Sequence, residues 1–385
     1  MYSTKKTPKM RKHKQSRRRR RSLFISSTNH TKYNKNTTKK NNTNNKKKKQ
    51  QQTTKPKMFT QLNCSPFVIK NNASSASSVV VTDSSNNNNK SNSILDSLFS
   101  VFGGKNHIQH SSYSSSPSSF FSPKSCVPKE AVLNLAKTWN SKNKTNKIMN
   151  TNYDNVYEDL KHKLSNVCSN EKCWFKQLGS SSSYNTNYAP NMPESSKKTN
   201  RWWLSNIDIL KILHQYEETY PFFKLLGPSP IDFDTKIDNI CVEDSLCNLN
   251  LNTYMKKGIT KIGIVFNTDT HDQGGSHWIS LFINIPNKTI FFFDSAGDIC
   301  PSEIMSLVSR LKKQGLKESV PMVFTFDQNY PKVHQLTTSE CGMYSLFFII
   351  NMITDTLTNE QLKTKTIPDK VMVNLRNKYF NPLET

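Results

Sequence analysis

The sequence predicts an α+β fold, in which a buried helix packs on a central sheet of about four strands. The run from His277 to Ile285 alternates in hydropathy and the run 289–293 is apolar, so the two runs are typical of a β-hairpin. Cys341 opens a helix-compatible apolar stretch of about three turns that ends at Ile353. A helix of this kind buries its surface against neighbouring strands, which gives a layered α+β domain.

The positive charge of the chain is concentrated at its N-terminus. Residues 1–60 contain 21 Lys and Arg and no Asp or Glu, in a chain of net charge +26. Such an arm cannot bury enough apolar surface to offset its ordering entropy, and we expect 1–124 to be a disordered basic arm and linker. Contact of residues 1–60 with DNA or RNA phosphates is one interpretation. A nuclear-localisation signal, or the drift of an Asn- and Lys-rich genome, would produce the same composition.

The rest of the chain divides into three parts by composition. We expect a helical accessory region at 125–178, a linker loop at 179–200 and a C-terminal domain at 201–385. Within that domain Ser205 is placed to cap a helix. The other elements expected there are a rigid loop at 227–234, strands at 261–266 and 322–326, and a helix at 302–314.

Eight cysteines in 385 residues do not indicate a disulfide-stapled secreted protein, and a reducing compartment would suit a reactive thiol. Cys126, Cys168 and Cys173, with His162, could form a zinc site, but no second closely spaced pair follows, which favours structural cysteines. The N-terminus lacks the apolar core of a signal peptide and the longest apolar run, 346–350, is too short for a bilayer. We therefore expect a soluble protein without a metal or organic cofactor.

The residues around Cys341 indicate nucleophilic chemistry. Ser339 could act as the N-cap of the helix, and Gly342 would keep the space beside the sulfur open. Because Cys341 would lie in the first turn of this helix, the helix dipole would favour a thiolate. The predicted hairpin brings His277 close to Asp294, a histidine and carboxylate pair suited to activating a thiol. The order of these residues along the chain is His, Asp, Cys.

This pattern resembles the Ulp1 and adenovirus-protease superfamily of cysteine proteases. The features shared with it are His277-Trp278, Asp294 seventeen residues later, and Gln335 six residues before Cys341-Gly342. Within the superfamily the chain looks most similar to the proteases of large nucleocytoplasmic DNA viruses. The resemblance implies that 201–385 is the catalytic domain, and that Cys341, His277, Asp294 and Gln335 are nucleophile, base, orienting acid and oxyanion donor.

The resemblance also implies a substrate and a setting. Trp278, Trp203 and Asp208 would line the substrate groove, with protein substrates cut after Gly-Gly in Gly-Gly-X sites. With this resemblance we expect a monomer in the virion core and the host cytoplasm, without membrane contact. The Gly103-Gly104 pair could be a site of self-cleavage after Gly104, although an ordinary flexible linker is the favoured interpretation. Two alternatives stay open: a deconjugating protease for SUMO or a ubiquitin-like modifier, and an inactive nucleic-acid-binding scaffold.

Overall fold

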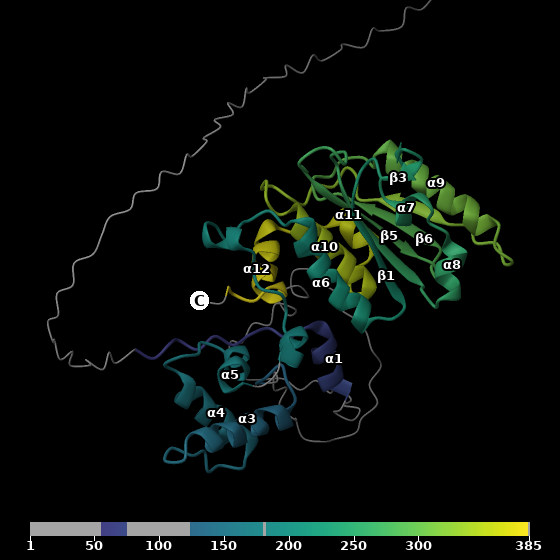
Figure 1. The fold of residues 1–385 in the computed structure, drawn as a ribbon. Coiled ribbons are helices and arrows are strands. Elements are labelled where there is room, and N and C mark those ends of the chain that lie inside the picture. The colour runs from purple at the N-terminus through teal and green to yellow at the C-terminus, as the bar shows by residue number, and fades with distance from the viewer. Residues whose placement is uncertain (1–54, 75–123, 180–181, 384–385) are drawn as a thin grey trace, which may run out of the picture. The chain divides into compact units, whose positions relative to one another are not determined.

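A five-stranded mixed sheet forms the centre of the C-terminal domain (Figure 1). The computed structural model describes residues 55–74, 124–179 and 182–383, so most of the basic arm, the segment 94–102 and Gly104 lie outside the described residues. The strand order is β1-β4-β5-β6-β7, with parallel pairs at both edges and antiparallel pairs between β4, β5 and β6. The strands are β1 (Phe223–Pro230), β4 (Lys261–Asn267), β5 (Trp278–Asn284), β6 (Thr289–Phe293) and β7 (Thr325–Gln328). The predicted α+β fold and hairpin are confirmed.

Helices cover both faces of this sheet, because alternate strand residues point to opposite sides. Val265 of β4 belongs to one apolar core and Ile264 to the other. The first core contains residues of α6 (Asn206–Thr219), α10 (Cys341–Ile353), α11 (Asn359–Thr364) and α12 (Asp369–Tyr379). The second contains residues of α7 (Asp244–Cys247), α8 (Leu251–Lys256) and α9 (Ser302–Leu316), and a two-stranded ribbon of β2 (Lys236–Ile237) and β3 (Ile240–Cys241) precedes α7.

Helix α10 is the most deeply buried element of the domain. All of its residues except Asn351 are buried, as expected of a helix that is apolar on every side. Its C-terminal carbonyls are met by Lys261, whose Nζ donates to the carbonyl oxygens of Met352 (3.2 Å) and Ile353 (2.8 Å) and pairs with Asp355 (2.7 Å). A cation at this end also complements the helix dipole. The first strand residue of β4 therefore fixes the end of the helix that carries Cys341.

Two strands differ from the sequence prediction. Residues 223–230 form the edge strand β1, although 227–234 was expected to be a loop. The register shifts between Leu226 and Ser229, where Gly227 has φ +77° and Pro228 has no N–H to donate. Proline is tolerated at a bulge in an edge strand, which is why the prolines misled the prediction. Strand β7 begins at Thr325, three residues later than expected.

The accessory region folds around its own apolar core, which includes part of the predicted linker. Helices α3 (Lys129–Lys142), α4 (Tyr153–Leu164) and α5 (Glu171–Leu178) confirm the helical prediction for 125–178. Leu62 is buried in the same core and α1 (Pro66–Ser74) follows it, so residues 55–74 differ from the predicted unstructured linker. The loop expected at 179–200 contains two short 3₁₀ helices, η1 (Ser182–Asn187) and η2 (Glu194–Lys197).

Six of the eight cysteines are paired in disulfides, although the cysteine content did not indicate a disulfide-stapled protein. The disulfides join Cys64 to Cys126, Cys168 to Cys173 and Cys241 to Cys247. The three cysteines of the alternative zinc site are thus bonded to sulfur. In the part of the chain that the structure describes, no three His, Cys, Asp or Glu side chains gather as a metal site requires. No described helix is both long and apolar enough to cross a bilayer.

Two asparagines connect the start of the described chain to its end. The Asn63 N–H donates to Asn381 Oδ1 (2.6 Å), and Asn381 Nδ2 donates back to the Asn63 carbonyl (3.1 Å) and to that of Ala189 (2.9 Å). Asn381 follows α12 and is fully buried. Residues before the accessory helices therefore satisfy a buried amide at the end of the C-terminal domain.

The contacts of Lys261 give a stability prediction. Lys261→Met should lower the free energy of unfolding by about 1–3 kcal/mol, because two buried carbonyls at the end of α10 lose their donor. Denaturant unfolding measures this change. Lys257→Met, at an exposed lysine just after α8, is the matched control and should leave the midpoint unchanged. Equal effects of the two substitutions would contradict the capping role of Lys261.

Candidate active site

Cys341 is the first residue of α10 and is only 3% exposed. It carries a free thiol at the N-terminus of the helix, where the sequence placed it. The predicted N-cap is wrong by one residue. Glu340 occupies that position, and the Ser339 hydroxyl donates to the Glu340 carboxylate (3.1 Å) instead of to the helix.

The β5–β6 hairpin brings His277 and Asp294 together. His277 directly precedes β5 and Asp294 directly follows β6, with Ser280 paired to Phe293 in the register between them. The His277 Nε2 atom lies 2.7 Å from Asp294 Oδ1, which also accepts the N–H of Ala296 (2.8 Å). The carboxylate is 5% exposed, so it contacts the imidazole with little competition from water.

The Cys341 side chain lies close enough to the His277 ring to influence its pKa. Burial lowers the pKa of His277, but the hydrogen bonds and negative charges of Asp294 and Cys341 outweigh burial and raise this pKa to about 10. Because Nε2 faces Asp294, the Nδ1 side of the ring is left for the sulfur. The structure therefore joins Cys341, His277 and Asp294 in one chain of contacts, as expected from the hairpin.

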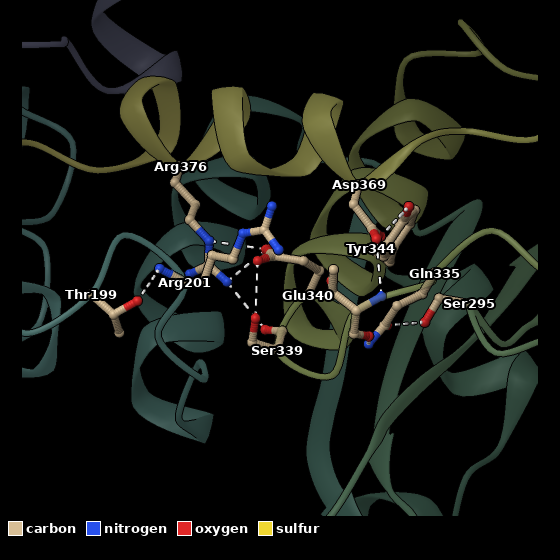
Figure 2. Close-up of polar contacts among 10 residues, drawn as sticks. Thr199, Arg201, Ser295, Gln335, Ser339, Glu340, Tyr344, Asp369 and Arg376 are labelled. Atoms are coloured by element: carbon tan, nitrogen blue, oxygen red, sulfur yellow. Dashed lines mark hydrogen bonds and ion pairs between the residues drawn. The ribbon is translucent and has the colours of Figure 1, made fainter.

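Gln335 is held by hydrogen bonds at both ends of its amide group (Figure 2). The Ser295 hydroxyl donates to Gln335 Oε1 (2.8 Å), and Gln335 Nε2 donates to the Thr337 carbonyl. A primary amide has two N–H groups, so one of them is used by Thr337. Because the Ser295 hydroxyl donates to Oε1, the oxygen end of the amide group faces Ser295 and the nitrogen lies at the other end.

The two candidate tryptophans both line one pocket of about 620 Å³, whose lining residues do not include His277, Asp294, Gln335 or Cys341. Trp203 is 51% exposed, whereas its neighbour Trp202 is buried in the core. Trp278 is half-buried and its Nε1 donates to the Leu204 carbonyl (2.8 Å). A Cβ on Gly342 would lie 2.9 Å from Leu204 Cβ and 3.2 Å from Trp278 Cδ1, so Gly342 lets these side chains approach the helix start, a different role from the space beside the sulfur.

Asp208 is placed away from this pocket's lining. Its carboxylate accepts the N–H and the hydroxyl of Ser205 (2.9 and 2.8 Å), while the Ser205 hydroxyl accepts the Asp208 N–H. This is a capping box at the start of α6, and it confirms the predicted Ser205 cap. The structure gives Asp208 a capping contact and no contact in the pocket.

The sequence did not single out Asn329, which holds the backbone of Asp294, or Ser295, which holds the side chain of Gln335. Asn329 is fully buried; its Oδ1 accepts the Asp294 N–H (2.8 Å) and its Nδ2 donates to the Asp294 carbonyl (2.7 Å).

His334 is also fully buried, and burial lowers its pKa to about 4. His334 bonds to the Leu362 carbonyl and the Ile367 N–H, so it is a neutral structural residue.

A buried cysteine at a helix N-terminus, beside a histidine that is held by a carboxylate, is the arrangement of an active site of the thiol-protease class. Residues 242–385 match the family described as "Ulp1 protease family, C-terminal catalytic domain".

The chain is similar to viral proteins of this kind. It is 33% identical over 183 residues to a protein of Acanthamoeba polyphaga mimivirus named as a thiol protease, covering 46% of this chain and 56% of the relative. It is 30% identical over 128 residues to an African swine fever virus protein named as a SUMO-1 cysteine protease; the match covers 33% of this chain and 46% of the relative. The crystal structure of a protease from the latter virus aligns with a TM-score of 0.48 at 21% identity; the alignment covers 67% of this chain and 92% of that structure. The chain thus spans about half the length of the curated relatives it matches.

The contacts of His277 predict a pH-dependent contribution to stability. Because the folded-state pKa is raised to about 10, the contribution is full below the unfolded value near 6.5 and is lost as the pH rises through about 10. In Asp294→Asn the pKa of His277 should fall toward 6.5, which NMR titration of the histidine ring signals would measure. His334, which does not contact Asp294, should keep its low pKa in both proteins. An unchanged midpoint for His277 would contradict the assignment.

Proposed function

We propose that the chain is a cysteine endopeptidase that acts on protein substrates through Cys341, His277 and Asp294. The observation that carries this proposal is the 2.7 Å contact between His277 Nε2 and Asp294, on a ring that lies close enough to Cys341 for the thiol to influence its pKa. The match of residues 242–385 to the Ulp1 protease family supports it.

The reaction follows from these contacts. His277 takes the thiol proton, and the Cys341 thiolate attacks the scissile carbonyl carbon to form a C–S bond. The C–N bond then breaks as His277 returns its proton to the leaving amine. Water, deprotonated by His277, hydrolyses the thioester and restores the thiol. Asp294 fixes the ring orientation and stabilises the imidazolium throughout.

We assign the oxyanion hole to the backbone N–H of Cys341 and the second amide N–H of Gln335. The backbone N–H groups in the first turn of a helix have no acceptor within the helix, which suits one of these roles. Ser295 and Thr337 hold the Gln335 amide in one orientation, so the donor is fixed before substrate binds. Each such donor is worth roughly 3–4 kcal/mol in the transition state of acyl transfer.

The surroundings of Cys341 favour substrates with small residues at the cleaved bond, which supports cleavage in Gly-Gly-X sites. A Cβ at position 342 would lie 3.2 Å from Trp278 Cδ1, so Trp278 packs closely against the start of α10. In this proposal Trp278 narrows the approach to the thiol. We propose that Trp278 and the exposed Trp203 line the substrate groove, and that Asp208 orders the start of α6 next to it.

We propose a role in maturation of virion core proteins, in the virion and the infected cell, because the relatives that the chain resembles are viral proteins named as proteases. In this proposal the basic arm tethers the enzyme to packaged nucleic acid, where local concentration of enzyme and substrate is high. The arm up to residue 54 and the Gly104 self-cleavage site lie outside the described residues. Both remain predictions. Mass spectrometry of the active protein and of Cys341→Ala, which identifies the first residue of each, tests the self-cleavage prediction.

A deconjugating protease is the second candidate, because one relative is named as a SUMO-1 cysteine protease. Such an enzyme would use the same catalytic groups but would need a surface that fits a folded modifier. The intact contacts among His277, Asp294 and Cys341 weigh against the third candidate, an inactive scaffold.

Peptide cleavage tests the catalytic assignment. The purified chain should cut a quenched fluorescent peptide with a Gly-Gly-X site faster than a matched peptide with Val in place of the second Gly. Cys341→Ala and His277→Ala should lose roughly 10³-fold or more in kcat, and Asp294→Asn roughly 10²-fold or more. Retention of full activity by Cys341→Ala would refute the proposal.

A modifier carrying a C-terminal vinyl sulfone separates the two protease candidates. Maturation predicts peptide cleavage with little labelling of Cys341 by a SUMO or ubiquitin probe. Deconjugation predicts rapid labelling of Cys341 by one of these probes and slow cleavage of free peptides. A short peptide vinyl sulfone with the same Gly-Gly end is the control for the reactivity of the thiol.

A further inference from the structure

Helix α12 presents two charged side chains to the loop that carries the proposed oxyanion donor. Asp369 and Arg376 are seven residues apart, which is close to two helical turns, so they lie on one face of the helix. Both point to the segment between Gln335 and Cys341 (Figure 2). We call this segment, residues 335–341, the oxyanion loop.

Asp369 holds the front of the oxyanion loop. Its Oδ2 accepts the backbone N–H groups of Leu336 (3.1 Å) and Thr337 (3.0 Å), and its Oδ1 accepts the Tyr344 hydroxyl (3.0 Å). The Leu336 side chain is 85% exposed, so packing of that side chain does not fix the loop here. The fixed point is the carboxylate, which bonds to the residue whose carbonyl receives the Gln335 amide.

Arg376 holds the rear of the same loop. Its Nη2 lies 2.7 Å from Glu340 Oε2 and donates to the Ser339 carbonyl (3.1 Å), and both charged side chains are almost fully buried. The guanidinium also lies 4.4 Å from the ring centre of Trp202. Glu340 directly precedes Cys341, so the nucleophile and the amide are tied to one rigid helix from opposite ends of the loop.

We propose that Asp369 is a positioning residue for the oxyanion hole: it fixes the backbone at 336–337 and, through Thr337, the direction of the Gln335 amide. This inference rests on the proposed function of Cys341 and Gln335. Asp369 does not touch the substrate in this scheme. Its effect is on the transition state, where displacement of a donor by about 1 Å costs up to about 100-fold in rate.

The test is Asp369→Ala, with kcat, KM and the rate of Cys341 alkylation by iodoacetamide measured on the full chain. Alkylation of a thiolate needs no oxyanion hole, whereas peptide hydrolysis does. Asp369→Ala should therefore lower kcat about 10- to 100-fold, with KM and the alkylation rate within about twofold of wild type.

Two further variants separate positioning from folding. In Asp369→Asn the amide oxygen can still accept from 336–337 while Nδ2 donates to the Tyr344 oxygen, so kcat should recover to within about fivefold of wild type. Tyr344→Phe removes the third contact of Asp369 and leaves the two loop contacts. It should lower the melting temperature and change kcat by no more than about twofold. The double variant Gln335→Ala, Asp369→Ala should be no slower than Gln335→Ala alone.

The inference is overturned if Asp369→Ala keeps wild-type kcat, if its alkylation rate falls in parallel with kcat, or if its effect adds in full to that of Gln335→Ala. These outcomes are distinct from failure of the proposed function. In that case the wild-type chain would not cleave peptides, or Cys341→Ala would cleave them as well as wild type.

Discussion

The site depends on the register between β5 and β6. Because Ser280 pairs with Phe293, the residue before one strand and the residue after the other are brought to the same end of the hairpin. That pairing puts the Asp294 carboxylate against the His277 ring. A shift of the register by one residue would move the side chains of the shifted strand to the opposite face of the sheet. The hairpin is central in the sheet, with β4 and β7 on either side, so its register is held from both directions.

Cys341 is fixed by different means. Helix α10 is held by burial along its length and by Lys261 at its C-terminal end, while the loop before it is held by side chains of α12. His277 and Asp294 thus come from the ends of two strands, and Cys341 comes from a helix packed on that sheet. Cys341, His277 and Asp294 meet at one end of that sheet because the β5–β6 hairpin and helix α10, each held by its own contacts, meet there.

Local pattern in the sequence was enough to predict the hairpin, the helix after Cys341 and the helix capped by Ser205. These elements are indicated by hydropathy alternation, apolar runs and capping residues that lie within a few positions of one another. The same reasoning missed β1, because prolines at an edge-strand bulge look like a loop. It also missed the contacts of Asn329 with Asp294 and of Asp369 with 336–337, which join residues more than 30 positions apart. Nothing in the local composition around those residues reports such partners.

The reciprocal bonds between Asn63 and Asn381 bear on how the chain can be divided. Position 201 marks a change in composition, yet the Asn381 amide just beyond α12 bonds to Asn63, before the accessory helices, and to Ala189, after them. A fragment that starts at 201 would leave that amide without these partners, at the end of the helix that contacts the oxyanion loop. A shortened protein intended to keep α12 in place should therefore retain residues 55–200 together with the C-terminal domain.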